Sequence, residues 1–465
     1  MVFSSSIFIF YFLPIVLAGY YLVRDKYKNY FLLFASLFFY FWGEEKNVLI
    51  IILSILINYI SGLLVSYFNE KSYKRIMLIL AVVLNIGLLF YYKYTNFFIN
   101  SINNLINTDI FVKQIALPIG ISFFTFQGLA YVIDLYWGNV EVQKNPMKIA
   151  LYICLFPQLI AGPIVRYKDV AAQIDKREES VDKFATGIFR FVVGLAKKII
   201  LSNGVGIIVD EIFNVPYNEH AVLTAWLGIL CYTLQIYFDF SGYSDMAIGL
   251  GKMFGFDFLE NFDLPYVSTS ITEFWRRWHI SLSSFFKDYV YIPLGGSRQG
   301  NVYWHIFIVF ALTGLWHGAA WNFVVWGLWH GFFRIVEKLW SKHPINFIIP
   351  KIFKYIVTML IVMIGWVMFR SDTLGYAIGF VGRMFGLNAP AQVYYQTGYY
   401  VDLYRIFIIV LSIASSLGIF RILNERLMKN NHYIVMRNCV TIMLMFVCIM
   451  YVMNATYNPF IYFRF

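Results

Sequence analysis

The chain contains few charged residues. Asp, Glu, Lys and Arg make up 14% of its 465 residues, whereas soluble globular proteins carry about a quarter. Hydrophobic residues reach 60% and the mean hydropathy is +0.65. These values exclude an ordinary soluble domain and predict an all-α, polytopic integral membrane protein.

Cysteine and metal-binding patterns are also scarce. The four cysteines lie in apolar stretches without a CxxC spacing, which is typical of small core residues: Cys154, Cys231, Cys439 and Cys448. The seven histidines form neither HxxxH nor HExxH. The string Gly249-Leu250-Gly251-Lys252 lacks the first glycine and the Ser or Thr of a phosphate loop. We therefore expect no metal and no tightly bound cofactor.

No internal repeat, low-complexity tract or long linker divides the chain. We therefore expect a single membrane-embedded domain, 1–465. A crossing of the hydrocarbon core needs ~20 mostly apolar residues, and about eleven or twelve stretches of this kind are present. They lie near 5–23, 29–43, 47–67, 76–92, 147–165, 184–202, 221–238, 303–316, 319–336, 350–369, 405–423 and 437–453.

The first apolar run has no basic region before it and no Ala-x-Ala site before Arg24, so we expect a retained span. Basic residues follow the first and third spans: Arg24, Lys26, Lys28, Lys71, Lys74 and Arg75. By the positive-inside rule the amino terminus faces outward. The net charge of +11 fits cytoplasmic loops that meet lipid headgroups, and an anionic cytoplasmic thioester explains it equally well. We expect no nucleic-acid partner.

The most polar stretch, 257–301, cannot cross the bilayer as a lipid-facing helix. Apolar residues recur in it at three- and four-residue steps, which predicts one stripe of a single helix that ends at Pro293 and Gly295-Gly296. The stripe comprises Ile271, Phe274, Trp275, Trp278, Leu282, Phe285, Phe286 and Tyr289. Charged residues occupy the other side, as in an interfacial helix, and His279 lies beside them.

The tripeptide Trp-His-Gly occurs twice in apolar sequence, at 316–318 and at 329–331. Ionisable residues at membrane depth are costly and are candidates for function, although a structural histidine bonded to a carbonyl is the alternative. On one continuous helix over 316–331, His317 and His330 lie ~20 Å apart in rise and on nearly opposite faces. This geometry favours a pairing of His317 with His279 on the preceding segment, and a structural role for His330.

Other polar groups interrupt apolar sequence. The cluster Asp239, Ser241, Tyr243, Ser244 and Asp245 fits the wall of a tunnel or acceptor channel and, equally, a helix break capped by Asp and Ser. We interpret Gln158 and Arg166 as structural. Arg276 and Arg277 are candidates for contact with the phosphates of a ligand, and headgroup pairing is the alternative. His220, His343 and His432 lie near span ends, where water can satisfy them.

The sequence Phe-Trp-Arg-Arg-Trp-His at 274–279, followed 38 positions later by His317 within Leu-Thr-Gly-Leu-Trp-His-Gly-Ala at 312–319, resembles the membrane-bound O-acyltransferases. Within that superfamily the chain is most similar to the alginate O-acetyltransferase branch of bacterial polysaccharide acetylation proteins. The resemblance extends over nearly the whole chain. It includes 156–164, 237–245, Trp-Val-Met-Phe-Arg at 366–370 and Phe-Ile-Tyr-Phe-Arg-Phe at 460–465.

The resemblance implies a multi-helix fold around a central tunnel, with a thioester donor from the cytoplasm and an acyl acceptor on the outer side. It implies that His317 is the catalytic residue and that His279 is its companion with a positioning or hydrogen-bonding role. Further candidates for the substrate site or tunnel are Trp275, Arg276, Arg277, Trp278, Trp316, Asp239, Ser241 and Tyr243. Acetyl-coenzyme A is the donor that this resemblance suggests.

These residues suit acyl transfer from a thioester to a hydroxyl. A neutral imidazole at His317 takes the acceptor's proton as its oxygen attacks the thioester, and such general base catalysis contributes ~10²–10⁴ in rate. His279 or an amide near the glycine-rich ends is a candidate donor to the oxyanion. Neither a G-x-S-x-G turn nor a Cys-His arrangement is present, which favours direct transfer over an acyl-enzyme.

Three functions are compatible with these features. The first is an O-acetyltransferase of a bacterial cytoplasmic membrane, which moves acetyl groups toward an exopolysaccharide or cell-wall glycan and hands them to a separate extracytoplasmic transferase. The second is a D-alanyl transfer protein for teichoic acids. The third is a proton-coupled transporter or flippase, although no inverted repeat or pair of broken helices favours it.

Overall fold

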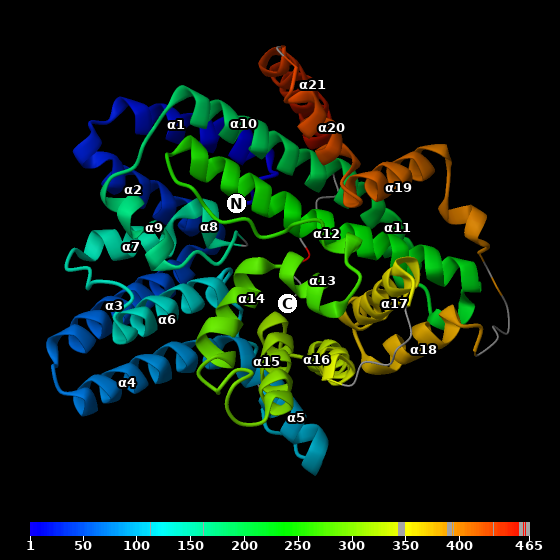
Figure 1. Ribbon diagram of the computed structural model, residues 1–465, viewed down its shortest axis with the longest axis horizontal. Helices are drawn as coiled ribbons and strands as arrows, with labels where there is room; N and C mark the ends of the chain where they lie inside the picture. The colour runs from blue at the N-terminus through cyan, green and yellow to red at the C-terminus, as the bar shows by residue number, and fades with distance from the viewer. Residues whose placement is uncertain are drawn as a thin grey trace. The chain divides into compact units, whose positions relative to one another are not determined.

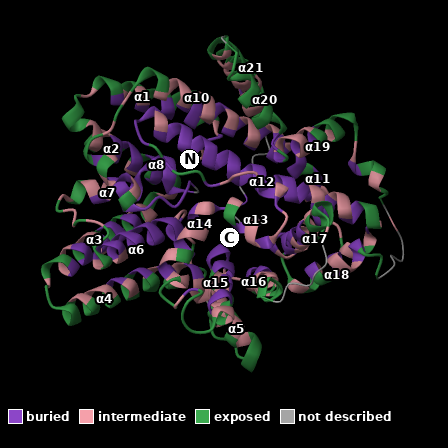
Figure 2. Cartoon of the chain, viewed as in Figure 1, coloured by how far each residue is buried: buried purple, intermediate pink, exposed green. Residues whose placement is uncertain are grey.

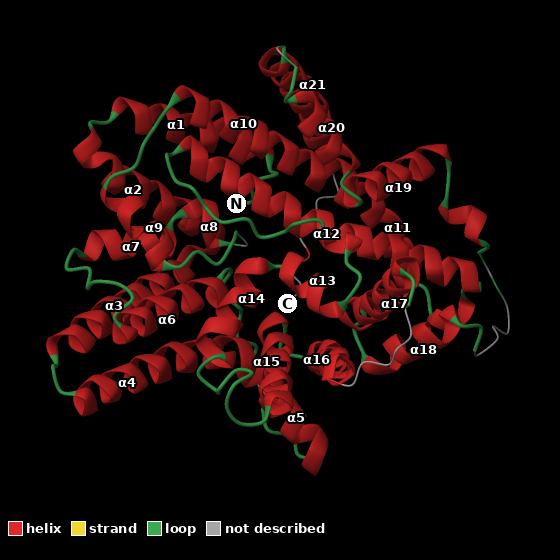
Figure 3. Ribbon diagram, in the orientation of Figure 1, coloured by secondary structure: helices red, strands yellow, loops and turns green. Residues whose placement is uncertain are grey.

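The computed structural model describes residues 1–111, 113–160, 162–342, 349–387, 393, 395–430, 432–454, 459 and 461. Within these ranges all regular secondary structure is helical, and loops connect the helices without a strand (Figure 3). The predicted all-α class is therefore confirmed.

Six helical segments of the described residues are long and apolar enough to cross a membrane, or seven if the bent pair Leu403–Ser416 and Ile419–Leu427 forms one crossing. Two apolar helices are shorter, Phe8–Leu22 and Val302–His317. These results confirm a polytopic membrane protein. The number is below the expected eleven or twelve partly because α2 (Asp25–Glu44) and α3 (Val48–Tyr67) count as one segment.

The chain forms two compact units. The first comprises Met1–Phe191 and Tyr243–Glu260, and the second comprises Val192–Gly242 and Asn261–Phe465. Helices α10 (Val181–Ala196) and α12 (Val222–Met253) contribute residues to both units (Figure 1). A single functional domain over 1–465 stays a prediction.

The first unit contains a group of three packed helices, α3, α4 (Lys71–Leu89) and α6 (Ile121–Trp137) (Figure 1). Asn58 of α3 and Asn85 of α4 exchange two amide hydrogen bonds of 3.0 Å, and Gly128 of α6 lies against Asn58. Besides α2 and α3, the helices of this unit are α1 (Leu13–Leu22), α4 (Lys71–Leu89), α5 (Thr95–Ile106), α6 (Ile121–Trp137), α7 (Pro146–Cys154), α8 (Phe156–Leu159) and α9 (Tyr167–Asp175).

One expectation for this unit is wrong. The predicted span 147–165 is divided between α7 and α8, because Pro157 has no backbone N–H with which to continue the helix. Helix α6 corresponds to none of the predicted spans, and its 17 residues are fewer than the ~20 that a full crossing needs. It is buried on nearly all sides, which explains its apolar character.

The second unit has an aromatic core to which α12, α13 (Ile271–Arg277), α16 (Trp321–Lys342) and α17 (Lys351–Arg370) contribute. Its helices besides α12 are α11 (Asn203–Phe213), α13 (Ile271–Arg277), α14 (Ile280–Phe286), α15 (Val302–His317), α16 (Trp321–Lys342), α17 (Lys351–Arg370), α18 (Leu374–Met384), α19 (Leu403–Ser416), α20 (Ile419–Leu427) and α21 (Tyr433–Asn454). Figure 2 shows α12 largely buried.

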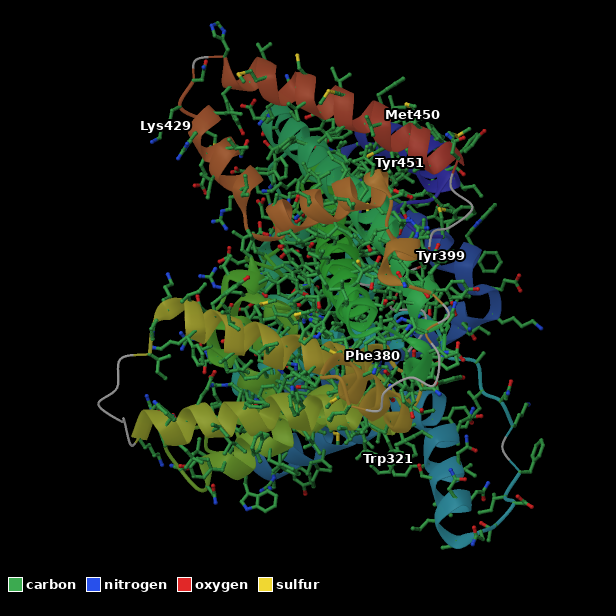
Figure 4. All side chains as sticks on the ribbon, turned by 90° about the vertical axis from the view of Figure 1, so that its right-hand side faces the viewer. Trp321, Phe380, Tyr399, Lys429, Met450 and Tyr451 are labelled. Carbon is green, nitrogen blue, oxygen red and sulfur yellow. The ribbon has the colours of Figure 1, made fainter. Side chains whose placement is uncertain are left out.

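Helix α21 contrasts with α12 in burial. In its most apolar stretch only 6% of residues are buried, against 72% in α12. Figure 4 shows Lys429 beside the turn between α20 and α21, and Met450 and Tyr451 toward the other end of α21. Its apolar side chains are suited to contact with lipid.

The helix predicted within 257–301 is interrupted. Helix α13 ends at Arg277, and His279 adopts a left-handed conformation with φ of 44° before α14 begins. The predicted apolar stripe is nevertheless buried along its whole length. The spacing of apolar residues indicates which face is buried. Because a single left-handed residue leaves that spacing almost unchanged, the sequence does not reveal the break in the helix.

A continuous helix over 316–331 is also wrong. Helix α15 ends at His317 because Gly318 is extended, and α16 begins at Trp321 and packs back along α15. Glycines permit α15 and α16 to approach closely. A Cβ at Gly314 would collide with the carbonyl of Phe323, and a Cβ at Gly327 would collide with the carbonyl of Phe310.

Candidate active site

His317 is the last residue of α15 and is 3% exposed. Aromatic rings surround it. The centroid of its imidazole lies 4.9 Å from the Trp326 ring, 5.0 Å from that of Trp316 and 5.3 Å from that of Phe369. Three elements, α15, α16 and α17, therefore supply the rings around this histidine.

His279 occupies the sharp turn between α13 and α14 and is 2% exposed. Asn261 holds this turn. Its backbone carbonyl accepts from the Ile280 N–H at 2.9 Å, and its side-chain oxygen accepts from the N–H and the hydroxyl of Ser281 and lies 3.3 Å from His279 Nδ1. Burial lowers the pKa of His279 to about 3, so its imidazole is neutral at physiological pH.

The two histidines meet although 38 positions separate them. Their ring centroids are 6.4 Å apart, and the His279 ring is 5.8 Å from that of Trp316. His279 lies in the left-handed turn that interrupts the predicted helix, between the short helices α13 and α14. This turn, and not a helix face, presents the His279 ring to His317. The proximity is an observation, and the catalytic roles of His317 and His279 stay predictions.

His330 does not face away from His317, contrary to the sequence analysis. Trp326 contacts both, with ring centroids 4.9 Å from His317 and 5.2 Å from His330. His330 is fully buried, stacks on Phe274 at 6.0 Å, and neither ring nitrogen has a hydrogen-bond partner among the described residues. The assumption of a continuous helix caused the error, since a hairpin places two distant positions beside one side chain.

The tryptophans proposed for the substrate site are buried and form one aromatic group. Trp275 contacts the His330 ring edge-on at 5.4 Å, and Trp278 lies 4.9 Å from Trp366. Sequence analysis did not single out Trp326 or Trp366 as site residues. A signal existed for Trp326, because it precedes His330 by four positions and therefore shares its helix face.

Arg276 and Arg277 differ in their surroundings. Arg277 binds Glu273 at 3.1 Å and Asp263 at 3.3 Å, while Arg276 is exposed and forms no ion pair with a described residue. Hydrogen bonds from the Thr269 backbone and further polar contacts lower the pKa of Glu273. Of the two arginines, only Arg276 retains a guanidinium that is not already paired with a carboxylate, so it remains the candidate for donor phosphates.

The polar cluster that begins at Asp239 does not break a helix. Helix α12 runs through it to Met253, so the interpretation of Asp and Ser as caps is wrong. Asp239 instead forms a buried ion pair of 2.5 Å with Lys198, which also binds Asn203 at 3.0 Å and the carbonyl of Pro459. The other Asp239 oxygen accepts from the Ile461 N–H at 2.9 Å.

The other members of this cluster have separate neighbours. The Ser241 hydroxyl is buried without a hydrogen-bond partner among the described residues, and Tyr243 stacks on Phe3 at 4.5 Å. Asp245 binds Arg190 at 2.6 Å. A role of these side chains in a tunnel wall stays a prediction.

The remaining polar residues singled out in the sequence have mixed outcomes. Gln158 donates to the Tyr152 carbonyl at 2.6 Å, which supports its structural interpretation. His220 is buried at 1% exposure, so the expectation that water satisfies it is wrong, whereas His432 is exposed. His343, Ala161 of the 156–164 motif and most of 460–465 lie outside the described residues.

A cavity of about 210 Å³ lies beside the histidine group. Its lining comprises Asp210, Tyr232, Gln235, Ala320, Asn322, Phe323, Phe369, Arg370, Ser371, Asp372, Pro459 and Ile461. Phe369 connects the two regions, because its ring borders the cavity and contacts His317. The sequence analysis did not predict this cavity, which unites residues from distant parts of the second unit.

No group of three or more His, Cys, Asp or Glu side chains in the described part of the chain is arranged to hold a metal ion. The polar rings in contact with His317 are the imidazole of His279 and the indoles of Trp316 and Trp326. A buried neutral imidazole can accept a proton from a hydroxyl, and a neighbouring imidazole can orient a reactant or donate a hydrogen bond. A buried pair of this kind is suited to proton transfer.

Comparison with known proteins identifies relatives of this chain. Residues 140–378 match the membrane-bound O-acyltransferase family, MBOAT. A Pseudomonas syringae pv. tomato protein named "Probable alginate O-acetylase" is 44% identical over 83% of this chain and 74% of its own length. The Helicobacter pylori peptidoglycan O-acetyltransferase is 36% identical over 83% of this chain and 80% of its own.

A more distant similarity extends over less of the chain. The Bacillus subtilis teichoic acid D-alanyltransferase is 32% identical over 45% of this chain and 56% of its own length. Both histidines of the candidate site lie within the residues that match the family.

Proposed function

The chain belongs to the membrane-bound O-acyltransferase family, and from this we propose that it transfers acetyl groups from a cytoplasmic thioester across the membrane for O-acetylation of an extracytoplasmic polysaccharide. It is a multi-pass membrane acyltransferase. The relatives that match most of the chain carry names of polysaccharide O-acetylating enzymes, which favours acetyl transfer over D-alanyl transfer.

The observation that carries the mechanism is the convergence of His279 and His317 at a helix end beside a cavity. His317 accepts the proton of the acceptor hydroxyl as its oxygen attacks the thioester carbonyl. The new ester C–O bond forms, the thioester C–S bond breaks, and the proton passes from His317 to the departing thiolate. The imidazole returns to its neutral form, so the cycle needs neither redox chemistry nor an acyl-enzyme.

His279 acts as a positioning residue. Asn261 holds the turn that carries its neutral ring. The centroid of this ring lies 6.4 Å from that of His317. An imidazole that is already fixed in a water-poor site needs little reorganisation free energy when the reaction occurs. This is the basis of electrostatic preorganisation. We assign the donor as acetyl-coenzyme A, with Arg276 available to its phosphates.

We place the protein in a bacterial cytoplasmic membrane, where it passes acetyl groups to a separate extracytoplasmic transferase. Three groups of cells test the function: cells that lack the protein, cells that make the wild type and cells that make His317→Ala. Mild alkali releases ester-linked groups from their extracellular glycans, and acetate and D-alanine are both quantified. Acetate that depends on His317 supports the proposal. D-alanine that depends on His317 would replace it with the teichoic acid function, and no change in either would reject both.

A further inference from the structure

Two arginine side chains meet where α13 packs against α16. The Thr272 hydroxyl of α13 accepts a hydrogen bond from Arg334 of α16. Arg276 follows Thr272 by one helical turn and therefore shares its face of α13. This geometry places Arg276 beside Arg334, and their like charges repel each other. Two neighbouring guanidinium groups need a compensating negative charge.

The one carboxylate that contacts Arg334 is largely used by α13. Glu337 accepts from the backbone N–H groups of Ile271 and Thr272 at 2.5 and 2.9 Å and from the Thr272 hydroxyl at 2.5 Å. Its distance to the Arg334 guanidinium is longer, 3.6 Å. The Arg334 side chain is 27% exposed, so a ligand at the surface can reach the charge that Glu337 leaves uncompensated.

The same end of α16 is rich in positive charge. Lys338 follows Arg334 by one turn on the same face and forms no ion pair with a described residue. Arg276, Arg334 and Lys338 carry three positive charges against one negative charge on Glu337, which leaves +2. Between positions 334 and 354 the sequence has five basic residues and one acidic residue. By the positive-inside rule this end of α16 faces the cytoplasm.

The arginines are separated from the candidate base along α16. Trp326 contacts the His317 ring, and Arg334 follows Trp326 by eight residues, a rise of ~12 Å along the helix. In a coenzyme A thioester the pantetheine arm separates the phosphates from the sulfur. A phosphate site for such a donor therefore belongs at a distance from His317 and not beside it.

From these contacts we infer that Arg276, Arg334 and Lys338 form a phosphate-binding site at the cytoplasmic end of α16. The ligand is a phosphate ester, either the donor coenzyme, an assignment that rests on the proposed function, or an anionic lipid headgroup. The planar guanidinium groups bind phosphate oxygens through paired N–H groups, and Lys338 adds a further positive charge. Glu337 holds Arg334 and the start of α13 in place.

Binding of coenzyme A and of phosphate-free pantetheine tests the soluble ligand. Both are measured at equilibrium with the full chain in phosphatidylcholine nanodiscs. We expect coenzyme A to bind at least about tenfold more tightly, and Arg276→Gln to weaken its binding by about five- to twentyfold, as loss of a charge-assisted contact predicts. Arg298→Gln removes the same charge at another exposed position and is the matched control, with an affinity within about twofold of wild type.

Binding of phosphatidylglycerol tests the lipid headgroup. The protein is released from nanodiscs that contain this lipid, and the lipid that stays bound is quantified by native mass spectrometry. Lipid retention that Arg276→Gln reduces and Arg298→Gln does not, without an effect on coenzyme A, would identify a headgroup as the ligand. If neither coenzyme A nor phosphatidylglycerol depends on Arg276, the phosphate site is rejected.

A conservative substitution tests the second arginine. Arg334→Lys keeps the positive charge and removes the planar fork, so the side chain no longer binds two phosphate oxygens in parallel. We expect the ligand identified above to bind about three- to tenfold more weakly. An affinity equal to that of wild type would reject a site built from two guanidinium groups.

The same preparations separate failure of the inference from failure of the proposed function. Release of free thiol from acetyl-coenzyme A is measured for the wild type and for His317→Ala. Thiol release that depends on His317, with ligand binding that Arg276→Gln leaves unchanged, would reject only the phosphate site. Binding that depends on Arg276, without thiol release that depends on His317, would reject the proposed function and retain the phosphate site.

Discussion

The two Trp-His-Gly tripeptides have identical sequence and different structural surroundings. His317 ends α15, next to an extended glycine, and its ring contacts His279 and a residue of the cavity wall. His330 lies within α16 among Phe274, Trp275, Trp326 and Trp366. A Cβ at Gly365 would come within 2.9 Å of its Nε2, so packing encloses the ring.

The comparison indicates that the position of a residue within its helix determines whether a reactant can approach it. A residue at a helix end borders loops and cavities, where a reactant can approach, whereas a residue in mid-helix contacts neighbouring helices. Both histidines touch Trp326, so distance alone does not separate their roles. His317 also contacts Phe369, which borders the cavity, and the following substitutions test whether this difference separates their roles.

The largest effect is expected for His317→Ala. Loss of the general base should reduce the initial rate of thiol release from acetyl-coenzyme A by about 10²–10⁴, without a large change in unfolding temperature. Added imidazole should restore part of the rate, because the substitution leaves space for it. A rate within about threefold of wild type, which corresponds to less than ~1 kcal/mol in the barrier, would exclude His317 as the base.

A smaller effect is expected for His279. Because φ is 44° at this position, His279→Gly removes the ring without strain, and His279→Asn keeps a hydrogen-bonding group that tolerates the left-handed region. We expect His279→Gly to lower kcat by about tenfold, as loss of one hydrogen bond worth about 1.4 kcal/mol would, and His279→Asn to recover most of it. Equal rates for Gly and Asn would contradict a hydrogen-bonding role.

Gly327→Ala tests the hairpin that brings both histidines to Trp326. The added Cβ collides with the Phe310 carbonyl, so we expect destabilisation of about 1–3 kcal/mol, seen as a lower unfolding temperature. Gly375→Ala is the matched control, since a Cβ there meets no atom within 4 Å and alanine favours the helix. Equal unfolding temperatures for the two variants would show that the close approach is not needed.

The smallest effect is expected for His330→Leu. Its ring nitrogens have no hydrogen-bond partner among the described residues, so an apolar side chain of similar size removes an unsatisfied polar group. We expect the rate of thiol release to stay within about threefold of wild type, because the substitution should change the activation free energy by less than ~1 kcal/mol. A loss as large as that of His317→Ala would assign His330 to the reaction.

The sequence predicted the helical class, the membrane location and the proximity of His279 to His317, which the structure confirms. Composition and motif content carry this information directly. The sequence also predicted the buried stripe within 257–301, because a period of three to four residues reports burial regardless of a local break.

The rest depends on single backbone conformations and on long-range packing. The left-handed turn at His279 and the extended Gly318 each changed a predicted geometry without changing the hydrophobic pattern. The approach of His330 to Trp326, and the cavity beside Phe369, arise from helices that are distant in the sequence. No periodicity in one segment can reveal such contacts.

The central claim is that His317, and not His330, acts as the base. The direct measurement is acetate released by mild alkali from the extracellular glycans of cells that make wild type, His317→Ala or His330→Ala, with membrane levels matched. The account predicts that acetate is lost with His317→Ala and retained with His330→Ala. Full acetylation by His317→Ala, or loss with His330→Ala alone, would contradict it.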